Sequence, residues 1–431
     1  MWGTYKRYGI VIISTLMVWT VLEYMASNYY HQLDTNDFIL PAKKQYVDLR
    51  EPNESSRCPD VSTGMMKGRW KPRTLTARER VTVDTFLKSV RYRVPKSMQR
   101  RDGKCGNVAY INLNYFRALC NPEGATPCCY GYRCTNKSAD ECKCPKCYDF
   151  RNEIHAEYST WEAGDPRCQV KNFTVQETCD LLHGLTIAFI GDSLMRNLYT
   201  ALMLMLNNYD GKGVFRAVKA GVLATVSYNR QQLKGWCKNP ARLCAGIKDI
   251  PCEGMYAFSD RACTPNLFRR KTLCNGTLNV EVSTIPSAVV AKRFHEKFRS
   301  FLHKKNTVIL VGIGIHDHFN FEKVSNDYIY PVVDMIRKRK ASWPKLIWFA
   351  THKFGIMKSP LIPRQENSRV VAFNKRMSEA LGKYHIPIFD TYNLTSGVMS
   401  MDGTHFGIGV SSMKVQMFLN YFLELKSKPH W

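Results

Sequence analysis

The stretch Leu185-Thr-Ile-Ala-Phe-Ile-Gly-Asp-Ser-Leu-Met-Arg-Asn197 contains the change of pattern on which the fold prediction depends. Its first part, Leu185–Ile190, is a short apolar run of the kind expected for a strand buried on both faces of a sheet. A helical period follows directly after Gly191-Asp192-Ser193, because apolar residues then recur three or four positions apart. These residues are Met195, Leu198, Leu202 and Met205. The segment therefore predicts a strand, a sharp turn and a helix.

Similar patterns recur towards the C-terminus. The predicted strands are Thr307–Val311, Lys345–Ala350 and Ile386–Phe389, and the predicted helices are Tyr328–Arg339, Gln365–Tyr384 and Val410–Leu425. Residues 207–290 are less regular, with strand-like pieces at Gly221–Tyr228 and Leu278–Thr284 among five cysteines, and they resemble an insertion held by disulfides. The alternation of strands with helices predicts an α/β fold, in which a mainly parallel sheet is covered by helices on both faces.

Length and composition limit the class of protein. The chain has 431 residues, of which 45% are hydrophobic, so it can form two or three domains, or one large domain with additions, with a real core. All 16 cysteines lie between Cys58 and Cys274. An even number of cysteines in one region is typical of disulfides made in an oxidising compartment, and it argues against an ordinary cytosolic enzyme. The spacing of Cys142, Cys144 and Cys147 also fits a zinc site, but disulfides are favoured and no metal is expected.

The N-terminus is typical of a membrane anchor. Residues 8–26 form a nearly continuous apolar stretch that is just long enough to span a bilayer, and Lys6 and Arg7 precede it. Positive charge before the span predicts that the rest of the chain faces the lumen. A cleaved signal peptide is the rival interpretation, and Tyr24 and Met25 disfavour it because small residues are expected at a cleavage site.

Five glycosylation sequons agree with a lumenal chain: Asn53, Asn136, Asn172, Asn275 and Asn393. We therefore expect a single-pass type II protein of the Golgi membrane. The predicted layout is a cytosolic tail (1–7), a transmembrane anchor (8–26), a stem (27–57), a Cys-rich region (58–180) and a C-terminal domain (181–431).

Three predicted strand ends carry residues suited to chemistry. Gly191-Asp192-Ser193 places a serine at a helix start, Gly312–His318 is rich in glycine and histidine, and Asp402-Gly-Thr-His405 precedes the last helix. An Asp three residues before a His can hold the imidazole in one tautomer, which a serine nucleophile needs of its base. Each piece alone is weak, since Gly-Asp-Ser is common in turns and Asp-x-x-His in loops. Their combination and order favour a Ser193–His405–Asp402 triad.

These residues resemble the GDSL/SGNH superfamily. Residues 187–197 together with Asp402–His405 are similar to its PC-esterase branch, which includes plant trichome-birefringence-like polysaccharide O-acetyltransferases and the animal sialate O-acetyltransferase. The resemblance covers roughly residue 181 to the C-terminus. It implies an SGNH-hydrolase-like three-layer fold with Ser193 as nucleophile, His405 as general base and then acid, and Asp402 as the residue that orients His405. The layout of anchor, Cys-rich region and catalytic domain also matches the plant members.

The oxyanion hole departs from the family pattern. The resemblance implies that the serine N–H, a glycine and an asparagine further on donate to the oxyanion, but no Asn directly follows the glycine block here. His316 after Gly314 is a substitute donor, Asn320 is another, Gly221 is a candidate glycine, and Asn197 lies one helical turn beyond Ser193. His352, at a further strand end, is either a pocket residue or a structural histidine.

The expected function is a glycan O-acyltransferase of the secretory pathway that works through an acyl-enzyme. The alternatives are a lumenal esterase with the same triad and a non-catalytic glycan-binding ectodomain. We expect no bound cofactor, an acyl donor such as acetyl-CoA as co-substrate, and a glycan as partner. The net charge of +26 favours an acidic acceptor, because a positive field attracts anions. A nucleic-acid partner is disfavoured for a lumenal chain.

Overall fold

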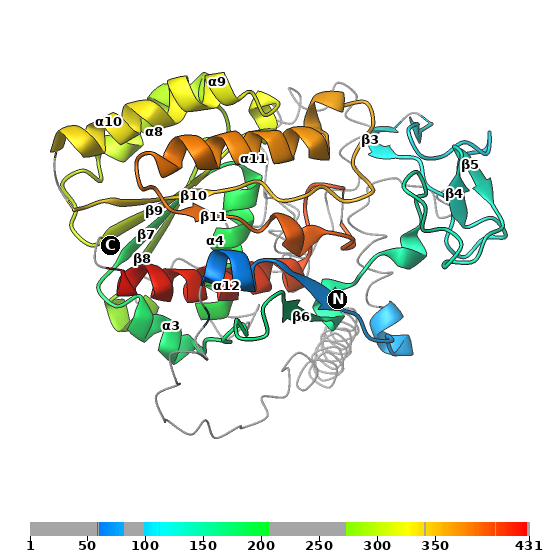
Figure 1. Cartoon of the computed structure of the whole chain (residues 1–431), viewed down its shortest axis with the longest axis horizontal. Coiled ribbons are helices and arrows are strands. Elements are labelled where there is room, and N and C mark those ends of the chain that lie inside the picture. The colour runs from blue at the N-terminus through cyan, green and yellow to red at the C-terminus, as the bar shows by residue number, and fades with distance from the viewer. Residues whose placement is uncertain are drawn as a thin grey trace, which may run out of the picture. The chain divides into compact units, whose positions relative to one another are not determined.

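A five-stranded parallel sheet lies at the centre of the fold (Figure 1). The structure is a computed structural model that describes residues 58, 60–81, 99–111, 113–206, 273–339, 342–400 and 402–428. The strands are β7 (Thr186–Gly191), β8 (Asn279–Thr284), β9 (Thr307–Gly312), β10 (Lys345–Phe349) and β11 (Ile388–Phe389). Their order is β11-β10-β9-β7-β8, and each neighbouring pair is parallel. The parallel sheet predicted from the sequence is confirmed.

The two central strands are built from the apolar runs of the sequence. All of β9 is buried, as is β7 after Thr186, which is why their sequences do not alternate between polar and apolar residues. β7 and β9 pair in a register that sets Gly191 opposite Gly312. The loops that follow these strands therefore start side by side at the carboxyl edge of the sheet, where parallel sheets bind ligands.

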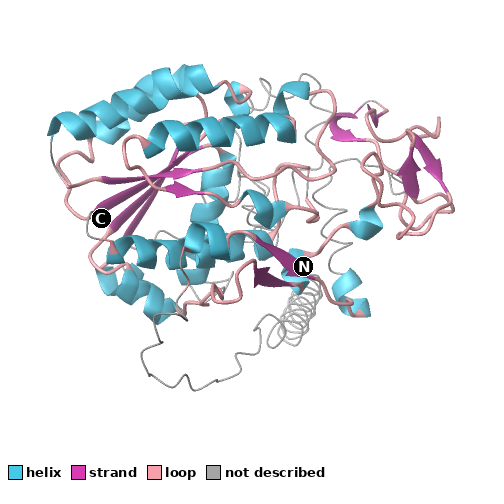
Figure 2. Cartoon of the chain, viewed as in Figure 1, coloured by secondary structure: helices cyan, strands magenta, loops and turns pink. Residues whose placement is uncertain are grey.

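Helices cover both faces of the sheet (Figures 1 and 2). One side carries α8 (Ala291–Arg299), α9 (Phe321–Lys323), α10 (Tyr330–Arg339) and α11 (Asn367–Gly382). The other side carries α3 (Val175–Leu181) and α12 (Ile408–Ser427), and α12 contacts both α3 and α4 (Ser193–Leu206). The helix predicted over Tyr328–Arg339 begins in the structure with a π-helical turn, Val324–Ile329, and continues as α10.

A small antiparallel ribbon packs on this core. It consists of β1 (Gly68–Lys71) and β6 (Thr160–Ala163). Trp70 and Trp161 are buried in it edge to face, with ring centroids 5.4 Å apart, and the indole nitrogen of Trp70 donates to the carbonyl oxygen of Leu394 at 2.8 Å. Both tryptophans belong to the same hydrophobic core as the sheet. In the described residues, side chains from both sides of residue 180 share this core, and the domain boundary predicted there stays a prediction.

Disulfides hold the Cys-rich region. Its hairpins are β2 (Ala109–Tyr110) with β3 (Leu113–Arg117) and β4 (Cys128–Tyr130) with β5 (Arg133–Thr135). The pairs are Cys58–Cys168, Cys105–Cys129, Cys120–Cys134, Cys128–Cys142, Cys144–Cys147 and Cys179–Cys274. Every cysteine that the structure describes is paired. The predicted disulfides are confirmed.

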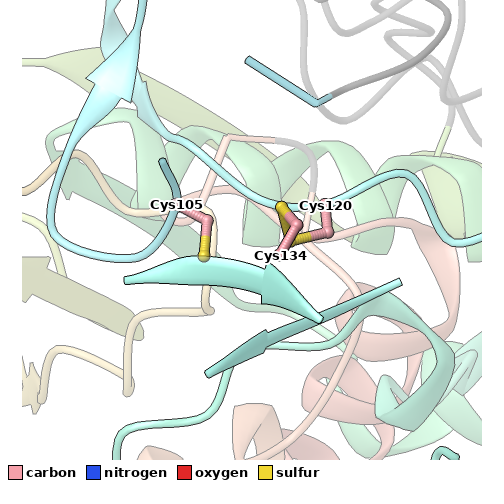
Figure 3. Close-up of side chains that lie close together, drawn as sticks. All are labelled: Cys105, Cys120 and Cys134. Atoms are coloured by element: carbon pink, nitrogen blue, oxygen red, sulfur yellow. A yellow bond between two sulfur atoms is a disulfide. The ribbon is translucent and has the colours of Figure 1, made fainter. Parts of the chain in front are cut away.

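The zinc alternative is not supported in the described residues. Two groups of three cysteine sulfurs lie close enough to share an ion, but their members belong to the disulfides above. Figure 3 shows the first group, where the sulfurs of Cys120 and Cys134 are bonded to each other beside Cys105. A sulfur in a disulfide offers no thiolate, so these cysteines cannot act as zinc ligands in this state.

Some predictions lie outside the described residues. They are the tail, anchor and stem (1–57) with Asn53, and the strand-like piece Gly221–Tyr228 with Gly221. Within the described ranges, the structure contains no helix that is both long and apolar enough to cross a bilayer.

Candidate active site

Ser193, His405 and Asp402 lie together at the carboxyl edge of the sheet. The Nε2 atom of His405 is 2.7 Å from the Oγ atom of Ser193, and its Nδ1 atom is 2.8 Å from Oδ2 of Asp402. Ser193 and His405 are 212 residues apart in sequence, so the fold brings them together. The arrangement has the order of contacts that a nucleophile, a base and an orienting carboxylate require.

The turn between β7 and α4 positions Ser193. Asp192 is buried beneath the turn, and its Oδ1 accepts a hydrogen bond from the backbone N–H of Leu194 at 2.9 Å, so it caps the helix start. Gly191 has φ +154°, and a Cβ atom there would clash with the carbonyl oxygen of Gly312. The strand can therefore turn this close to β9 only because residue 191 is glycine.

The turn 402–405 fixes the imidazole. Asp402 accepts backbone hydrogen bonds from Thr404 at 2.8 Å and His405 at 2.7 Å through Oδ1, which leaves Oδ2 for the ring. Burial raises the pKa of Asp402, but the charge of His405 and these hydrogen bonds outweigh it and hold the pKa well below its usual range. Asp402 therefore stays ionised and accepts from Nδ1–H, which leaves the lone pair of Nε2 for the proton of Ser193.

Thr404, the residue before His405, makes a hydrogen bond through each of its three polar groups. Its N–H donates to Asp402, as above, and its carbonyl oxygen lies 2.8 Å from Nε2 of His352. Its hydroxyl accepts from the Nζ atom of Lys358 at 2.8 Å. Burial lowers the pKa of Lys358 to about 8, although Asp402 acts in the opposite direction. Two of these contacts thus come from the segment after β10 that carries His352 and Lys358, and the third comes from Asp402 within the turn itself.

Two of the residues predicted to line the oxyanion hole, Gly314 and His316, lie in the described loop after β9. Gly314 and His316 follow β9, next to the turn that carries Ser193, and His316 interacts electrostatically with His405 and Lys358. Partial burial lowers the pKa of His316, against the effect of Asp317. The role of Gly314 and His316 in an oxyanion hole stays a prediction.

Asn197 lies one turn into α4, which is buried from Leu194 to Leu206. It is buried and lines a cavity of about 10 Å³ together with His352 and Lys414, and its Oδ1 atom has no hydrogen-bond partner among the described residues. A space of that size holds about one water molecule. The predicted role of Asn197 in the pocket stays a prediction.

Sequence reasoning missed Lys358, Lys414 and Thr404. Lys414 had a signal, because it is the one charged residue in the sequence from 406 to 423, so that α12 has no other charge before Glu424. A single charge in such a helix is either costly or functional. Lys358 lies in a loop, and nothing in the sequence around it marks the contact with Thr404.

The sequons in the described residues are accessible. Asn136, Asn172, Asn275 and Asn393 are all exposed, as an acceptor of a bulky glycan must be. Glycosylation at these positions stays a prediction.

Comparison with known proteins gives structural neighbours. No protein-family profile matches the chain, and no curated protein matches it. Similar solved structures include a lipolytic protein of the G-D-S-L family from Veillonella parvula, at 10% identity and a TM-score of 0.24, covering 34% of this chain and 81% of that one. Another is the lipase/acylhydrolase from Enterococcus faecalis, at 16% identity and a TM-score of 0.25, covering 36% and 79%. The first is named as a lipolytic protein and the second as a lipase/acylhydrolase, and the PC-esterase branch stays a prediction.

Proposed function

We propose that this chain is a glycan O-acyltransferase, in the simplest case an O-acetyltransferase, that acts in the Golgi lumen through an acyl-enzyme on Ser193. The observation that carries the proposal is the contact of Ser193 Oγ with His405 Nε2 at 2.7 Å, while Asp402 holds the other ring nitrogen. A serine hydroxyl is a weak nucleophile unless a base removes its proton, and this geometry supplies the base.

The reaction runs in two halves. Ser193 Oγ attacks the acyl carbonyl of the donor and passes its proton to His405 Nε2, and backbone N–H groups stabilise the oxyanion by about 3 kcal/mol per donor. The bond from the acyl carbon to the leaving group breaks, and the leaving group takes the proton from His405. A sugar hydroxyl then attacks the acyl-enzyme, gives its proton to His405 and leaves as the ester, and the proton returns to Ser193.

The choice of transfer over hydrolysis rests on other observations. The resemblance to the PC-esterase branch favours transfer, and so does the predicted anchor, because modifying enzymes of the secretory route are typically tethered. The disulfides agree with a lumenal location. The triad itself serves both reactions, since water and a sugar hydroxyl can resolve the same acyl-enzyme.

The test begins with the nucleophile. The purified full chain should be labelled covalently by a fluorophosphonate, Ser193→Ala should abolish labelling, and His405→Ala should reduce it nearly as much. Ser300→Ala, which changes an exposed serine after α8, is the control that should label normally. A wild-type chain that is folded but never labelled would leave only the non-catalytic, glycan-binding interpretation.

The acceptor decides between the two reactions. Incubation with acetyl-CoA or another acetyl donor and a panel of glycans should increase acceptor mass by one acetyl group. Acetate release that is independent of every acceptor would make the protein an esterase.

An acidic acceptor is the substrate class we propose, whether sialylated, uronic-acid-containing or sulfated. The net charge of +26 supports it, and so does Lys358, whose amine contacts Thr404 in the turn of Asp402 and His405. Transfer should be faster to acidic than to neutral glycans, and the difference should shrink between about 10 mM and about 150 mM salt. Equal rates without salt dependence would contradict this class.

A further inference from the structure

A buried histidine and a buried lysine lie directly behind the catalytic turn. His352 is 3% exposed and Lys414 is 6% exposed, and the Nζ atom of Lys414 lies 2.6 Å from Nδ1 of His352. The other ring nitrogen of His352 lies 2.8 Å from the carbonyl oxygen of Thr404. The two side chains therefore form a continuous hydrogen-bonded connection from α12 to the turn that carries Asp402 and His405.

The chemistry of the partners fixes the tautomer of His352. A carbonyl oxygen only accepts, so Nε2 of His352 must carry the hydrogen and donate to Thr404. A neutral imidazole then has its lone pair on Nδ1, and the amine of Lys414 must donate there. Lys414 consequently keeps His352 in the one tautomer that can hold Thr404.

The surroundings of the pair keep the imidazole ring of His352 neutral. Burial lowers the pKa of His352 well below its usual range, and the charge of Lys414 lowers it further, so the ring does not protonate. Burial also lowers the pKa of Lys414 to about 7, against the attraction of Asp390 and Asp192. The Lys414 nitrogen additionally lies 5.4 Å from the centre of the Phe349 ring.

The His352–Lys414 connection lies where it can affect the orientation of His405. His352 follows β10, and Lys414 lies on α12, which starts three residues after His405. Thr404 is between the two triad members of the turn, and its N–H already bonds Asp402. A shift of the Thr404 carbonyl would therefore rotate the peptide that joins it to His405. Displacements of about 1 Å in an active site cost about 100-fold in rate.

We propose that His352 and Lys414 are positioning residues for His405: Lys414 sets the tautomer of His352, and His352 holds the carbonyl of Thr404 so that Nε2 of His405 meets Ser193. The inference rests on the proposed function, because it concerns the same nucleophile. A purely structural role would also explain why the two polar groups satisfy each other inside the core, so the test must separate the two roles.

Variants of His352 separate the hydrogen bond from packing. His352→Gln places an amide N–H close to the site of Nε2 and can still donate to Thr404, whereas His352→Leu fills similar space without a donor. The readouts are the rate of fluorophosphonate labelling per folded molecule, kcat and KM on p-nitrophenyl acetate, and Tm. His352→Leu should label about 10- to 100-fold more slowly with a lower kcat and unchanged KM, and His352→Gln should recover most of the rate.

A double-mutant cycle tests the connection itself. Lys414→Met should slow labelling in the wild-type background but have no further effect in His352→Leu, because the lysine acts through the histidine. Gln416→Leu is the matched control: it lies on the same helix, is buried, and bonds the backbone of Phe173 instead of the catalytic turn. It should lower Tm without lowering the labelling rate.

The outcomes are distinct. If wild type labels and His352→Leu labels at the same rate, or if His352→Gln is as slow as His352→Leu, the positioning role is wrong. Additive effects of Lys414→Met and His352→Leu would also overturn the connection. If wild type itself does not label, the proposed function fails, and this failure is recognisable before any variant is compared.

Discussion

Asp402 binds His405 twice, once through the backbone N–H at 2.7 Å and once through the ring Nδ1 at 2.8 Å. The first bond shapes the turn, and the second sets the tautomer. One side chain thus controls both where the imidazole lies and which of its nitrogens can act as a base.

Asp402→Asn should separate these two roles. The amide oxygen can keep the backbone bonds of Oδ1, which leaves the amide N–H₂ facing Nδ1 of His405. The ring would then carry its hydrogen on Nε2 and could not accept the proton of Ser193. We expect labelling to slow by a factor on the order of 10³ or more while Tm changes little. Near-normal labelling by a folded Asp402→Asn variant would show that the tautomer is not set by this carboxylate.

Gly403 should be required for the same turn. Its φ is +83°, and a Cβ atom there would clash with the backbone of Lys358. Gly184 has a similar φ of +74° but open space around it. Gly184→Ala should therefore cost about 1 kcal/mol of backbone strain, and Gly403→Ala about 3 kcal/mol or more together with a slower labelling rate. Urea unfolding and labelling of the pair provide the comparison, and equal losses would contradict the crowding argument.

Asp192 should give the protein a pH-dependent stability. Burial raises its pKa from 3.8 to about 6, although Leu194 and the charges of His405 and Arg196 act against the rise. Because the pKa is higher in the folded state than in the unfolded state, protonated Asp192 adds to the free energy of unfolding. This addition is complete below pH 3.8 and is lost as the pH rises through about 6. The rise corresponds to about 3 kcal/mol.

Asp192→Asn removes this titration but keeps an oxygen that can cap α4. Relative to wild type, the variant should become progressively more stable between about pH 4 and about pH 7, by up to about 3 kcal/mol. Urea unfolding at several pH values measures the difference. Parallel stability curves for the two proteins would mean that Asp192 is ionised in the fold at little cost.

The local patterns of the sequence were sufficient to predict the central strands of the sheet and the contact between Asp402 and His405. The apolar run at 185–190 became β7, the run Thr307–Val311 became β9, and the Asp402 and His405 pair stands where the last strand-to-helix connection was expected. Each of these features depends on residues that are adjacent or one turn apart. Such features are visible in a single chain without knowledge of tertiary contacts.

The remaining features depend on contacts between distant residues. Periodicity cannot show that Lys414 reaches His352, that Trp70 bonds Leu394, or which of the cysteines pair. The contact of Lys358 with Thr404 joins two loops, and loops have no period. These parts of the site had to be read from the structure, because only the folded chain defines which buried polar groups meet.

The disulfides should differ in how much they contribute to the free energy of unfolding, according to the length of the loops that they close. Cys58–Cys168 joins residues 110 apart, whereas Cys144–Cys147 joins residues 3 apart. Because a crosslink restricts the unfolded chain more when its loop is longer, we expect the Cys58→Ala/Cys168→Ala variant to lose about 5 kcal/mol and the Cys144→Ala/Cys147→Ala variant about 2 kcal/mol. Urea unfolding followed by the fluorescence of Trp70 and Trp161, which are buried in the ribbon held by the first disulfide, measures both losses. Similar losses in the two variants would mean that local packing, and not the length of the closed loop, determines what each disulfide contributes.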